Sequence, residues 1–404
     1  MASSIRGARR SARLLGWAAA ALLAGTACAE PPPTGEAGTP RTTTEATSET
    51  AAEATSGSSA GSAAAIPRWT LSVPAFAVSQ LGLSDRYLAY AVVTPGASQG
   101  AARPTRVDAV DLDTKAIRTV ASTTWPQGQT DLVRISGSWL LWEDLERTPS
   151  TDVSSMRWKV LAHNLADGST RTLASSDLPS ALPSLAAGAG RLAWTQASGP
   201  DAASGFAVHV FETATGASRV LASGLPPVND LAVSAGGIYY TTADPGAASQ
   251  KVWCVPGSGG PPRPVDIGGP GRGLKIGETG LASWEDATVG PARRLGIGRL
   301  GDAAAADTLA QGPTFLDLPG ASNAAPGAGA VAFFDGVDHF RAVRVGLDGT
   351  LSAPIKLSRD GEALHVPCRI AAYGDEVAYC VEPDGASSGD GSGSSITVVV
   401  TSVP

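Results

Sequence analysis

Two cysteines near the C-terminal end carry the clearest chemical signal in this sequence. Cys368 and Cys380 lie at equal distances on either side of Gly374, on two short runs that are typical of adjacent antiparallel strands. If the loop has an odd length centred on that glycine, the two thiols lie directly opposite each other, within reach of a disulfide. An oxidising compartment favours that bond. The alternative is two small buried residues one register step apart, and Cys254 is interpreted as a separate buried thiol.

Other catalytic patterns in the chain lack the setting that they need. Residues 57–61 and 385–389 match the Gly-x-Ser-x-Gly element of serine hydrolases, but both lie in Gly/Ser-rich stretches without a strand, turn and helix around them. Residues 296–301 match a dinucleotide fingerprint, yet no helix follows, so we predict a strand and a turn there. The four histidines share no metal-ligand spacing. We therefore predict no metal and no cofactor, and a binding protein rather than an enzyme.

Polar and charged residues recur at the ends of the expected strands. One set stands where the first strand of a repeat begins: Asp131, Ser184, Asn229, Asp230, Arg272, Asn323 and Arg369. A second set of acids follows the second strands: Glu143, Asp144, Asp244, Glu285, Asp286, Asp335 and Glu382. Neither set contains a recognisable acid–base pair, so their role depends on the elements that carry them.

Those elements are short strands in a repeat. An apolar-x-aromatic triplet recurs seven times, with its aromatic residue at Tyr90, Trp142, Trp194, Tyr240, Trp284, Phe333 and Tyr379. A turn precedes each triplet, and most are followed by an alternating third strand, a second turn and a fourth strand. Four strands in this length form one β-propeller blade, and no later stretch has helical periodicity. The sequence therefore predicts an all-β, seven-bladed β-propeller, with six or eight blades as the alternatives, and aromatic residues that pack between blades.

The two ends of the repeat region predict how the ring closes. The last copy stops after its third strand, at residues 396–401, and residues 69–73 align with fourth strands such as residues 117–120. We therefore expect the N-terminal strand to complete the last blade, because an open ring would leave an unpaired strand edge.

The repeat resembles the TolB-type, WD40-like propeller repeat of bacterial envelope proteins. The resemblance is carried by Leu-Ala-Tyr and Leu-Ala-Trp second strands and by the segments 107–122, 160–175 and 208–223, and it spans roughly residues 67–403. It implies a propeller in an envelope protein but no particular function, because such repeats serve many roles. The TolB propeller has six blades, whereas seven copies are present here, and TolB's additional N-terminal domain has no counterpart before residue 66.

Residues 1–28 are interpreted as an export signal. Four arginines form a basic start, residues 14–24 are apolar but too short to span a bilayer, and small residues precede Cys28. The pattern resembles a bacterial lipoprotein signal, which implies that Cys28 is lipidated and becomes the first mature residue, although Gly25 stands where that family has an aliphatic residue. Cleavage without lipid, giving a secreted protein, is the alternative. Residues 29–66 are predicted to form a disordered Thr/Ser/Ala/Pro-rich tether, and residues 67–404 the propeller.

Charge and topology then give an expected function. The formal net charge of −7 does not favour nucleic acid or an anionic membrane surface. In a propeller, the starts of the innermost strands and the loops after the second strands share one face, so the two polar sets should surround the channel mouth within an acidic rim. We expect a monomeric, extracytoplasmic scaffold, held at the membrane by its lipid alone, that binds an envelope protein or a small, cationic ligand there. A solvated loop surface, a ligand sensor, and a lyase or hydrolase at the channel mouth are the alternatives.

Overall fold

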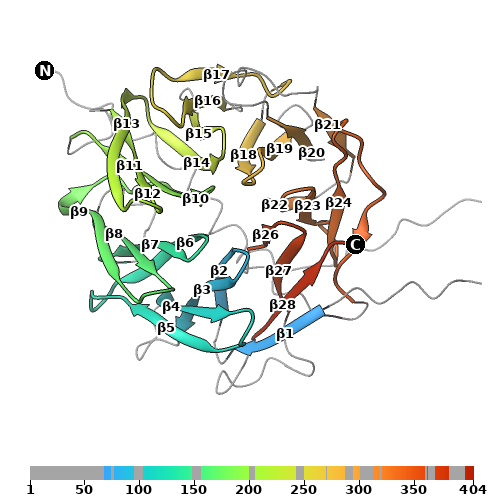
Figure 1. The fold of residues 1–404 in the computed structure, drawn as a ribbon, viewed down its shortest axis with the longest axis horizontal. Coiled ribbons are helices and arrows are strands. Elements are labelled where there is room, and N and C mark those ends of the chain that lie inside the picture. Colours follow the sequence, from blue (N-terminus) through green and yellow to red (C-terminus); the bar gives the residue numbers. More distant parts are fainter. Residues whose placement is uncertain are drawn as a thin grey trace, which may run out of the picture. The chain divides into compact units, whose positions relative to one another are not determined.

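The fold is a ring of seven four-stranded antiparallel sheets (Figure 1). The chain divides into two compact units, Met1–Ala65 and Ile66–Pro404, and every described residue belongs to the second. The computed structural model describes residues 68–73, 77–94, 103–147, 156–199, 205–242, 250–269, 271–286, 294–300, 313–317, 321–359, 362, 369–381 and 396–404. The expected signal and tether, with Cys28, lie outside the described residues.

Each blade runs from an innermost to an outermost strand. Blades 1 to 3 are β2 (Ala77–Leu83), β3 (Tyr87–Thr94), β4 (Arg103–Asp111) and β5 (Ile117–Ser122); β6 (Gln129–Ser136), β7 (Trp139–Leu145), β8 (Met156–Asn164) and β9 (Thr170–Ser180); and β10 (Leu185–Gly188), β11 (Arg191–Ala197), β12 (Phe206–Glu212) and β13 (Ala217–Leu225). Blades 4 and 5 are β14 (Val228–Ser234), β15 (Gly237–Thr242), β16 (Lys251–Pro256) and β17 (Arg263–Val265); and β18 (Gly271–Ile276), β19 (Leu281–Asp286), β20 (Arg294–Arg299) and β21 (Thr314–Leu316). Blades 6 and 7 are β22 (Ser322–Pro326), β23 (Ala330–Phe334), β24 (Phe340–Arg344) and β25 (Ile355–Lys356); and β26 (Ala371–Tyr373), β27 (Glu376–Val381), β28 (Ile396–Ser402) and β1 (Arg68–Val73).

The pattern of apolar residues follows the position of each strand in its blade. Second strands are covered on both faces by neighbouring blades, and every residue of β7 is buried. Outermost strands face solvent, and most residues of β5 are exposed. Tight turns join the innermost two strands, and Gly137 and Gly190 adopt the positive φ of 55° and 73° that such hairpins need.

The seven aromatic residues of the triplets pack between blades, as predicted. Their exposed fractions are 2% or less. Each of the seven apolar clusters combines side chains of two adjacent blades; Tyr90 of blade 1, for example, lies with Cys380 and Val398 of blade 7. Because a blade cannot cover its own faces, stacking around the ring forms the core.

The indole of Trp284 requires two glycines beside it. A Cβ atom on Gly296 would lie 2.4 Å from Trp284 Cε2, and one on Gly271 would lie 2.6 Å from Trp284 Cδ1. Gly296 lies in β20, so the Gly-rich motif that begins there is a strand, as predicted, and its glycine makes room for a buried ring.

The N-terminal strand completes the last blade, which confirms the predicted closure. Strand β1 pairs antiparallel with β28, from Arg68 opposite Thr401 to Val73 opposite Ile396. Val73 is 1% exposed and belongs to the cluster between blades 7 and 1. The first and last strands of the propeller therefore share one sheet (Figure 1).

The hairpin between β26 and β27 differs from expectation. Ala371 pairs with Ala378 and Tyr373 with Glu376, so the turn has two residues, Gly374 and Asp375. The assumed odd loop centred on Gly374 is therefore wrong, and the pairing beside the turn is shifted by one residue from the expected register. Cys380 is disulfide-bonded, whereas its expected partner, Cys368, lies outside the described residues.

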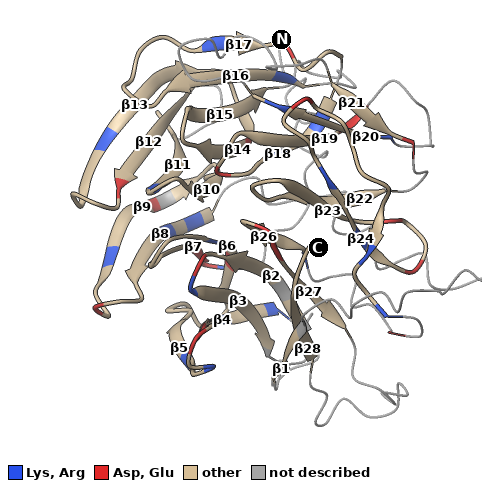
Figure 2. Ribbon diagram, turned by 45° about the vertical axis from the view of Figure 1, so that its right-hand side comes forward, with Lys and Arg blue, Asp and Glu red and all other residues tan. Residues whose placement is uncertain are grey.

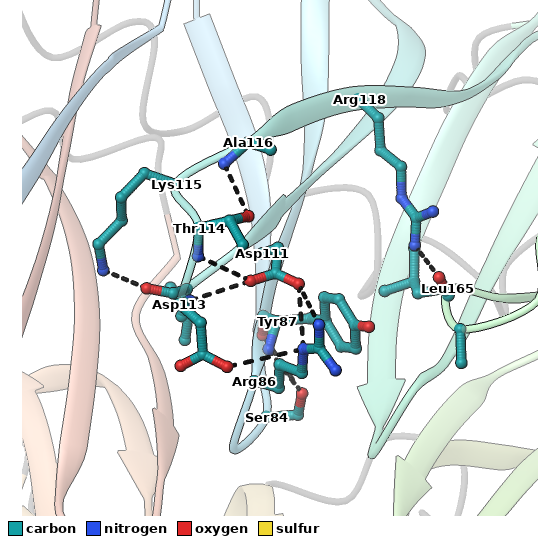
Figure 3. Close-up of polar contacts among 12 residues, drawn as sticks. Ser84, Arg86, Tyr87, Asp111, Asp113, Thr114, Lys115, Ala116, Arg118 and Leu165 are labelled. Carbon is teal, nitrogen blue, oxygen red and sulfur yellow. Dashed lines mark hydrogen bonds and ion pairs between the residues drawn. The ribbon is translucent and has the colours of Figure 1, made fainter.

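Side chains of the outermost strands tie neighbouring blades together at the rim. In the outermost strands of blades 1 to 4, an arginine lies opposite the third-strand residue that pairs with the middle of the triplet. In blades 1 to 3 this arginine donates to a backbone carbonyl of the next blade: Arg118 to Leu165, Arg171 to Gly216 and Arg219 to Gly257. The first of these is visible in Figure 3. At the closure Trp69 takes this position, and Lys115 Nζ of blade 1 lies 4.3 Å from the centroid of its ring.

Candidate functional site

Strand pairing brings the two polar sets to one end of the blades. Asp131 pairs with Glu143 in blade 2, and Arg272 pairs with Glu285 in blade 5. We call the end of the ring where innermost strands begin and second strands end the mouth face, and the opposite end, with the tight turns, the turn face. Charged residues of both signs are distributed around the ring (Figure 2).

A bulge interrupts the innermost strand near the mouth face in five blades. The register with the second strand shifts by one residue in β2, β6, β14, β18 and β22. In three of these strands the extra residue has a positive φ: Leu132 at 51°, Gly273 at 64° and Asn323 at 55°. A bulge re-aims the side chains around it, so the alternation of side chains along the innermost strand changes at this point.

Charged side chains from three blades interact in the channel. The guanidinium of Arg134 in blade 2 interacts electrostatically with Asp131 and Glu143 of its own blade, with Asp230 of blade 4 and with Arg369 of blade 7. Blades 2 and 4 are separated by blade 3, and blades 2 and 7 by blade 1. These side chains can therefore act on one another only across the inside of the ring. We call these five residues the channel cluster.

Burial shifts the pKa of two residues of the channel cluster, Asp131 and Arg134. It raises the pKa of the Asp131 carboxyl, although the backbone N–H of Leu132 and the charges of Arg369 and Arg134 oppose it. Burial and then the repulsion of Arg369 lower the pKa of Arg134 to about 10, against the attraction of the three acids. Arg134 is half-buried, and burial makes its charged form less stable than in water.

The other residues of the first set lie at the same end but link blades or face solvent. Ser184 Oγ donates to the carbonyl of Asn229 at 3.3 Å, which joins blades 3 and 4. Arg272 is 45% exposed and lies 3.4 Å from Glu285. Asn323 is half-buried at its bulge. The structure thus brings Asp131, Asp230 and Arg369 close to Arg134, and the remaining four residues of the set lie outside this cluster.

The acids expected at the rim are largely engaged by their own neighbours. Asp144 accepts from the Thr123 hydroxyl at 2.6 Å and the Thr124 hydroxyl at 2.7 Å. Asp286 pairs with Arg294 at 2.8 Å, and Asp335 with Arg341 at 2.7 Å. Asp244 and Glu382 lie outside the described residues. The described rim therefore offers a cationic ligand little free negative charge.

Sequence reasoning missed two residues of the site. Arg134 lies three residues into an otherwise apolar part of β6, and Gln80 lies in the apolar strand β2. An isolated charged or amide side chain in an innermost strand could have indicated a site residue, because buried strands rarely contain such side chains without a partner.

The turn face of the channel is held by contacts between turns. Glu278 of blade 5 reaches past blade 4 and accepts the backbone N–H of Ala189 in blade 3 at 3.0 Å. Burial raises the pKa of the Glu278 carboxyl, and the charge of Asp85 adds to this, against the N–H of Ala189. This end is therefore tied across the axis, and the channel cluster lies towards the mouth face.

A second concavity lies on the turn face between blades 1 and 2. It encloses about 320 Å³ and is lined by Arg86, Tyr87, Asp111, Thr114, Ala116, Arg118, Leu165 and Ala166. Figure 3 shows both Arg86 and Arg118 engaged within the protein. Arg86 Nη2 lies 2.8 Å from Asp111 Oδ2, and Arg118 donates to the Leu165 carbonyl. Because its cations are already satisfied, we favour the channel cluster as the functional site.

Two further properties bear on chemistry. Within the described ranges, no group of three or more His, Cys, Asp or Glu side chains is arranged to hold a metal ion. The same part of the chain contains no helix long and apolar enough to cross a membrane.

Comparison with known proteins supports the fold class. No protein-family model matches the sequence, and no curated protein matches it. Among solved structures, a prolyl endopeptidase aligns with a TM-score of 0.51 and 12% identity over 79% of this chain and 46% of its own. The acylaminoacyl peptidase of Pyrococcus horikoshii aligns with a TM-score of 0.50 and 10% identity over 77% of this chain and 49% of its own. TolB from Acinetobacter baumannii aligns with a TM-score of 0.43 and 12% identity over 68% of this chain and 64% of its own.

These likenesses concern architecture. The chain spans about half the length of the two peptidases, and the identities are low. The protein is a seven-bladed, all-β propeller.

Proposed function

We propose that the protein is an exported, lipid-anchored propeller that binds an envelope protein or a small ligand at its mouth face. The basic and apolar start, the small residues before Cys28 and the tether composition of residues 29–66 support export and anchoring. The convergence of Asp131, Asp230 and Arg369 with Arg134 in the channel supports binding, and it carries the proposal.

The cluster is costly for folding alone. A carboxyl with a raised pKa and a guanidinium with a lowered pKa are each less stable as ions than in water. Perturbed groups of this kind concentrate where proteins bind or react. A scaffold with no ligand gains nothing from holding them in its channel, whereas a binding site gains preorganised charge.

A triple variant, Asp131→Asn with Asp230→Asn and Arg272→Gln, tests whether the mouth face binds the partner. We expect the variant to fold, by circular dichroism and thermal unfolding, and to lose at least tenfold in capture of a partner from envelope extracts. The matched control, Asp113→Asn with Arg86→Gln, changes charges on the turn face and should capture the same partner. Equal capture by all three proteins excludes the mouth face as the binding surface.

Export and anchoring have their own test. Mass spectrometry of the mature protein should show a diacylated or triacylated Cys28 as the first residue, and Cys28→Ser should release the protein from the membrane fraction. An unmodified N-terminus at or beyond Cys28 contradicts the lipid anchor but leaves export intact.

A second function, hydrolysis or elimination at the same mouth, is favoured by one observation. The raised pKa of Asp131 suits a general acid. Turnover of peptide, ester or uronate substrates by the full chain, abolished in Asp131→Asn, would support it. Absence of turnover in such a panel leaves binding as the function.

A further inference from the structure

Arg134 is held in the channel without an acidic partner in direct contact. Its Nη1 donates to the carbonyl of Val133 at 2.8 Å and lies 3.5 Å from Gln80 Oε1. Both acceptors are neutral, and among the described residues no carboxylate lies within ion-pair distance of this guanidinium. Other described arginines do pair with an acid, as Arg294 does with Asp286 of the same blade at 2.8 Å. Several donors of Arg134 thus remain available.

Gln80 adds a second donor at the same place. Its side chain is 0% exposed, and within the described part of the chain Nε2 has no hydrogen-bond acceptor. The opposite amide orientation would set Nε2 against the Arg134 guanidinium, donor against donor, so the orientation with Oε1 towards Arg134 is favoured. A buried amide N–H without an acceptor costs about 1–3 kcal/mol, which a bound acceptor would recover.

The surrounding charges select the kind of acceptor. The charge of Arg369 lowers the pKa of Arg134 by repulsion, so a second cation lies near this guanidinium. Asp131, Glu143 and Asp230 attract the Arg134 guanidinium electrostatically, and burial raises the pKa of Asp131. A single negative charge with two oxygens satisfies the donors, because guanidinium binds carboxylate through two parallel N–H groups. The three acids repel a dianion about twice as strongly as a monoanion, which favours a single negative charge.

We propose that the channel binds the carboxylate of a ligand, held by Arg134 and the Gln80 amide with Arg369 as a second cation. This deepens the proposed binding function, on which it rests, and it replaces the cationic ligand expected from the rim acids. A carboxylate-bearing small molecule, or a carboxylate on a partner segment that enters the channel, presents this chemistry.

Titration of the full chain with N-acetylglycine, followed by calorimetry, tests the proposal. N-acetylglycinamide removes the negative charge, and inorganic phosphate at pH 7.5 supplies mostly a dianion. We expect saturable binding of N-acetylglycine, at least tenfold weaker binding of the amide and of phosphate, and at least a tenfold loss of affinity in Arg134→Gln. Arg103→Gln is the matched control, because Arg103 lies on the same face and donates to the neutral Pro126 carbonyl at 3.0 Å; its affinity should stay within twofold.

Gln80→Glu gives an independent result if Arg134→Gln fails to fold. The new carboxylate has the shape of the amide and lies against Arg134, so it should pair with the guanidinium and block the binding of a ligand carboxylate. We expect a folded protein with an unchanged or higher melting temperature that no longer binds N-acetylglycine. Absence of binding to the wild-type chain, equal binding of the amide or phosphate, or wild-type affinity in either variant overturns the carboxylate site. Partner capture that still depends on Asp131, Asp230 and Arg272 would then leave the broader binding function standing.

Discussion

At the scale of single residues, the protein uses buried carboxylates in two opposite ways. Asp131 is penalised by burial, and its pKa is raised. Asp335 is also buried, but it accepts hydrogen bonds from Arg341 at 2.7 Å and from the backbone N–H groups of its own loop, including His339 at 3.0 Å. These bonds outweigh burial and lower its pKa to about 2. The first arrangement fits a ligand site, and the second stabilises the loop between β23 and β24.

The lowered pKa of Asp335 gives a pH-dependent prediction. Its folded pKa of about 2 lies below the unfolded value of about 4, so its carboxylate contributes stability above pH 4 and loses it as the pH falls towards 2. Asp335→Asn should reduce the free energy of unfolding by on the order of 2 kcal/mol at neutral pH. In urea unfolding at a series of pH values, the difference from the wild type should shrink between about pH 4 and 2. Asp113→Asn, at a 78% exposed site, should change little, and a pH-independent difference for Asp335→Asn contradicts the assignment.

Close packing gives a second prediction for a single residue. A Cβ atom at position 296 would collide with the Trp284 indole at 2.4 Å. Gly296→Ala should therefore lower stability by about 1–3 kcal/mol, the usual cost of overpacking a core. Thermal unfolding measures the loss, and Gly329→Ala is the control, because its new methyl would meet only Asp375 Oδ1 at 3.8 Å. Equal melting temperatures for the two variants would show that Trp284 can move aside.

At the scale of elements, the blades are joined by repeated rim contacts in addition to their cores. Arg171 donates to the Gly216 carbonyl at 3.2 Å and lies 5.7 Å from the ring centroids of Trp139 and Phe211. The same position in β5 and β13 makes the same kind of bond to the next blade. This regular contact orients adjacent sheets, since it links the outermost strand of one blade to a turn of the next.

Removal of one rim contact should have a modest, local effect. We expect Arg171→Ala to cost about 1 kcal/mol, from one hydrogen bond and a cation–π contact. Hydrogen exchange should rise first in β9 and in the turn at Gly216. Arg359→Ala is the matched control, because Arg359 is an exposed arginine for which only the backbone N–H is seen bonded within the described chain. Unchanged exchange at both places in Arg171→Ala contradicts a structural role for the contact.

The elements also show what sequence reasoning can reach. Strands, blade number and closure followed from period and alternation, because these patterns record which faces are buried. The bulges could not be predicted from the sequence, because Leu132 and Asn323 adopt a positive φ at positions where a glycine would have indicated it. The bulge in β6 lies between Asp131 and Arg134. The sequence therefore predicted Asp131, at the start of the strand, as a site residue but did not predict Arg134, which follows the bulge.

The register shift at the bulges gives a different argument for the predicted Cys368–Cys380 disulfide. The residue after the triplet's aromatic pairs across the bulge with Asp131 in blade 2, Arg272 in blade 5 and Ser322 in blade 6. The same one-residue shift in blade 7 would place position 368 opposite Cys380. Peptide mapping without reduction should therefore find Cys368 linked to Cys380 and Cys254 free. Alkylation of Cys368 in the unreduced protein, or a bond to Cys254, contradicts this register.

At the scale of the whole molecule, the ring depends on a strand that is remote in sequence from its sheet. Strand β1 covers the outer edge of β28 along six residue pairs and buries Val73 between blades 7 and 1. Its Trp69 also takes the rim position that arginines hold elsewhere, next to Lys115 of blade 1. The channel cluster depends on closure, because the charge of Arg369 in blade 7 acts on Arg134 in blade 2 only when the ring is closed.

Deletion of residues 67–74 tests this dependence. The deletion exposes the edge of β28 and removes the buried Val73, whose side chain alone is worth about 1.5–3 kcal/mol. We expect a lower melting temperature, more aggregation through the free edge, and a larger loss of protection in blades 7 and 1 than in blade 4 by hydrogen exchange. Deletion of residues 40–47 shortens the preceding segment equally and should leave all three unchanged. If both deletions unfold like the full chain, strand β1 does not hold the ring closed, and a convergent channel cluster would have to be maintained by the interblade cores alone.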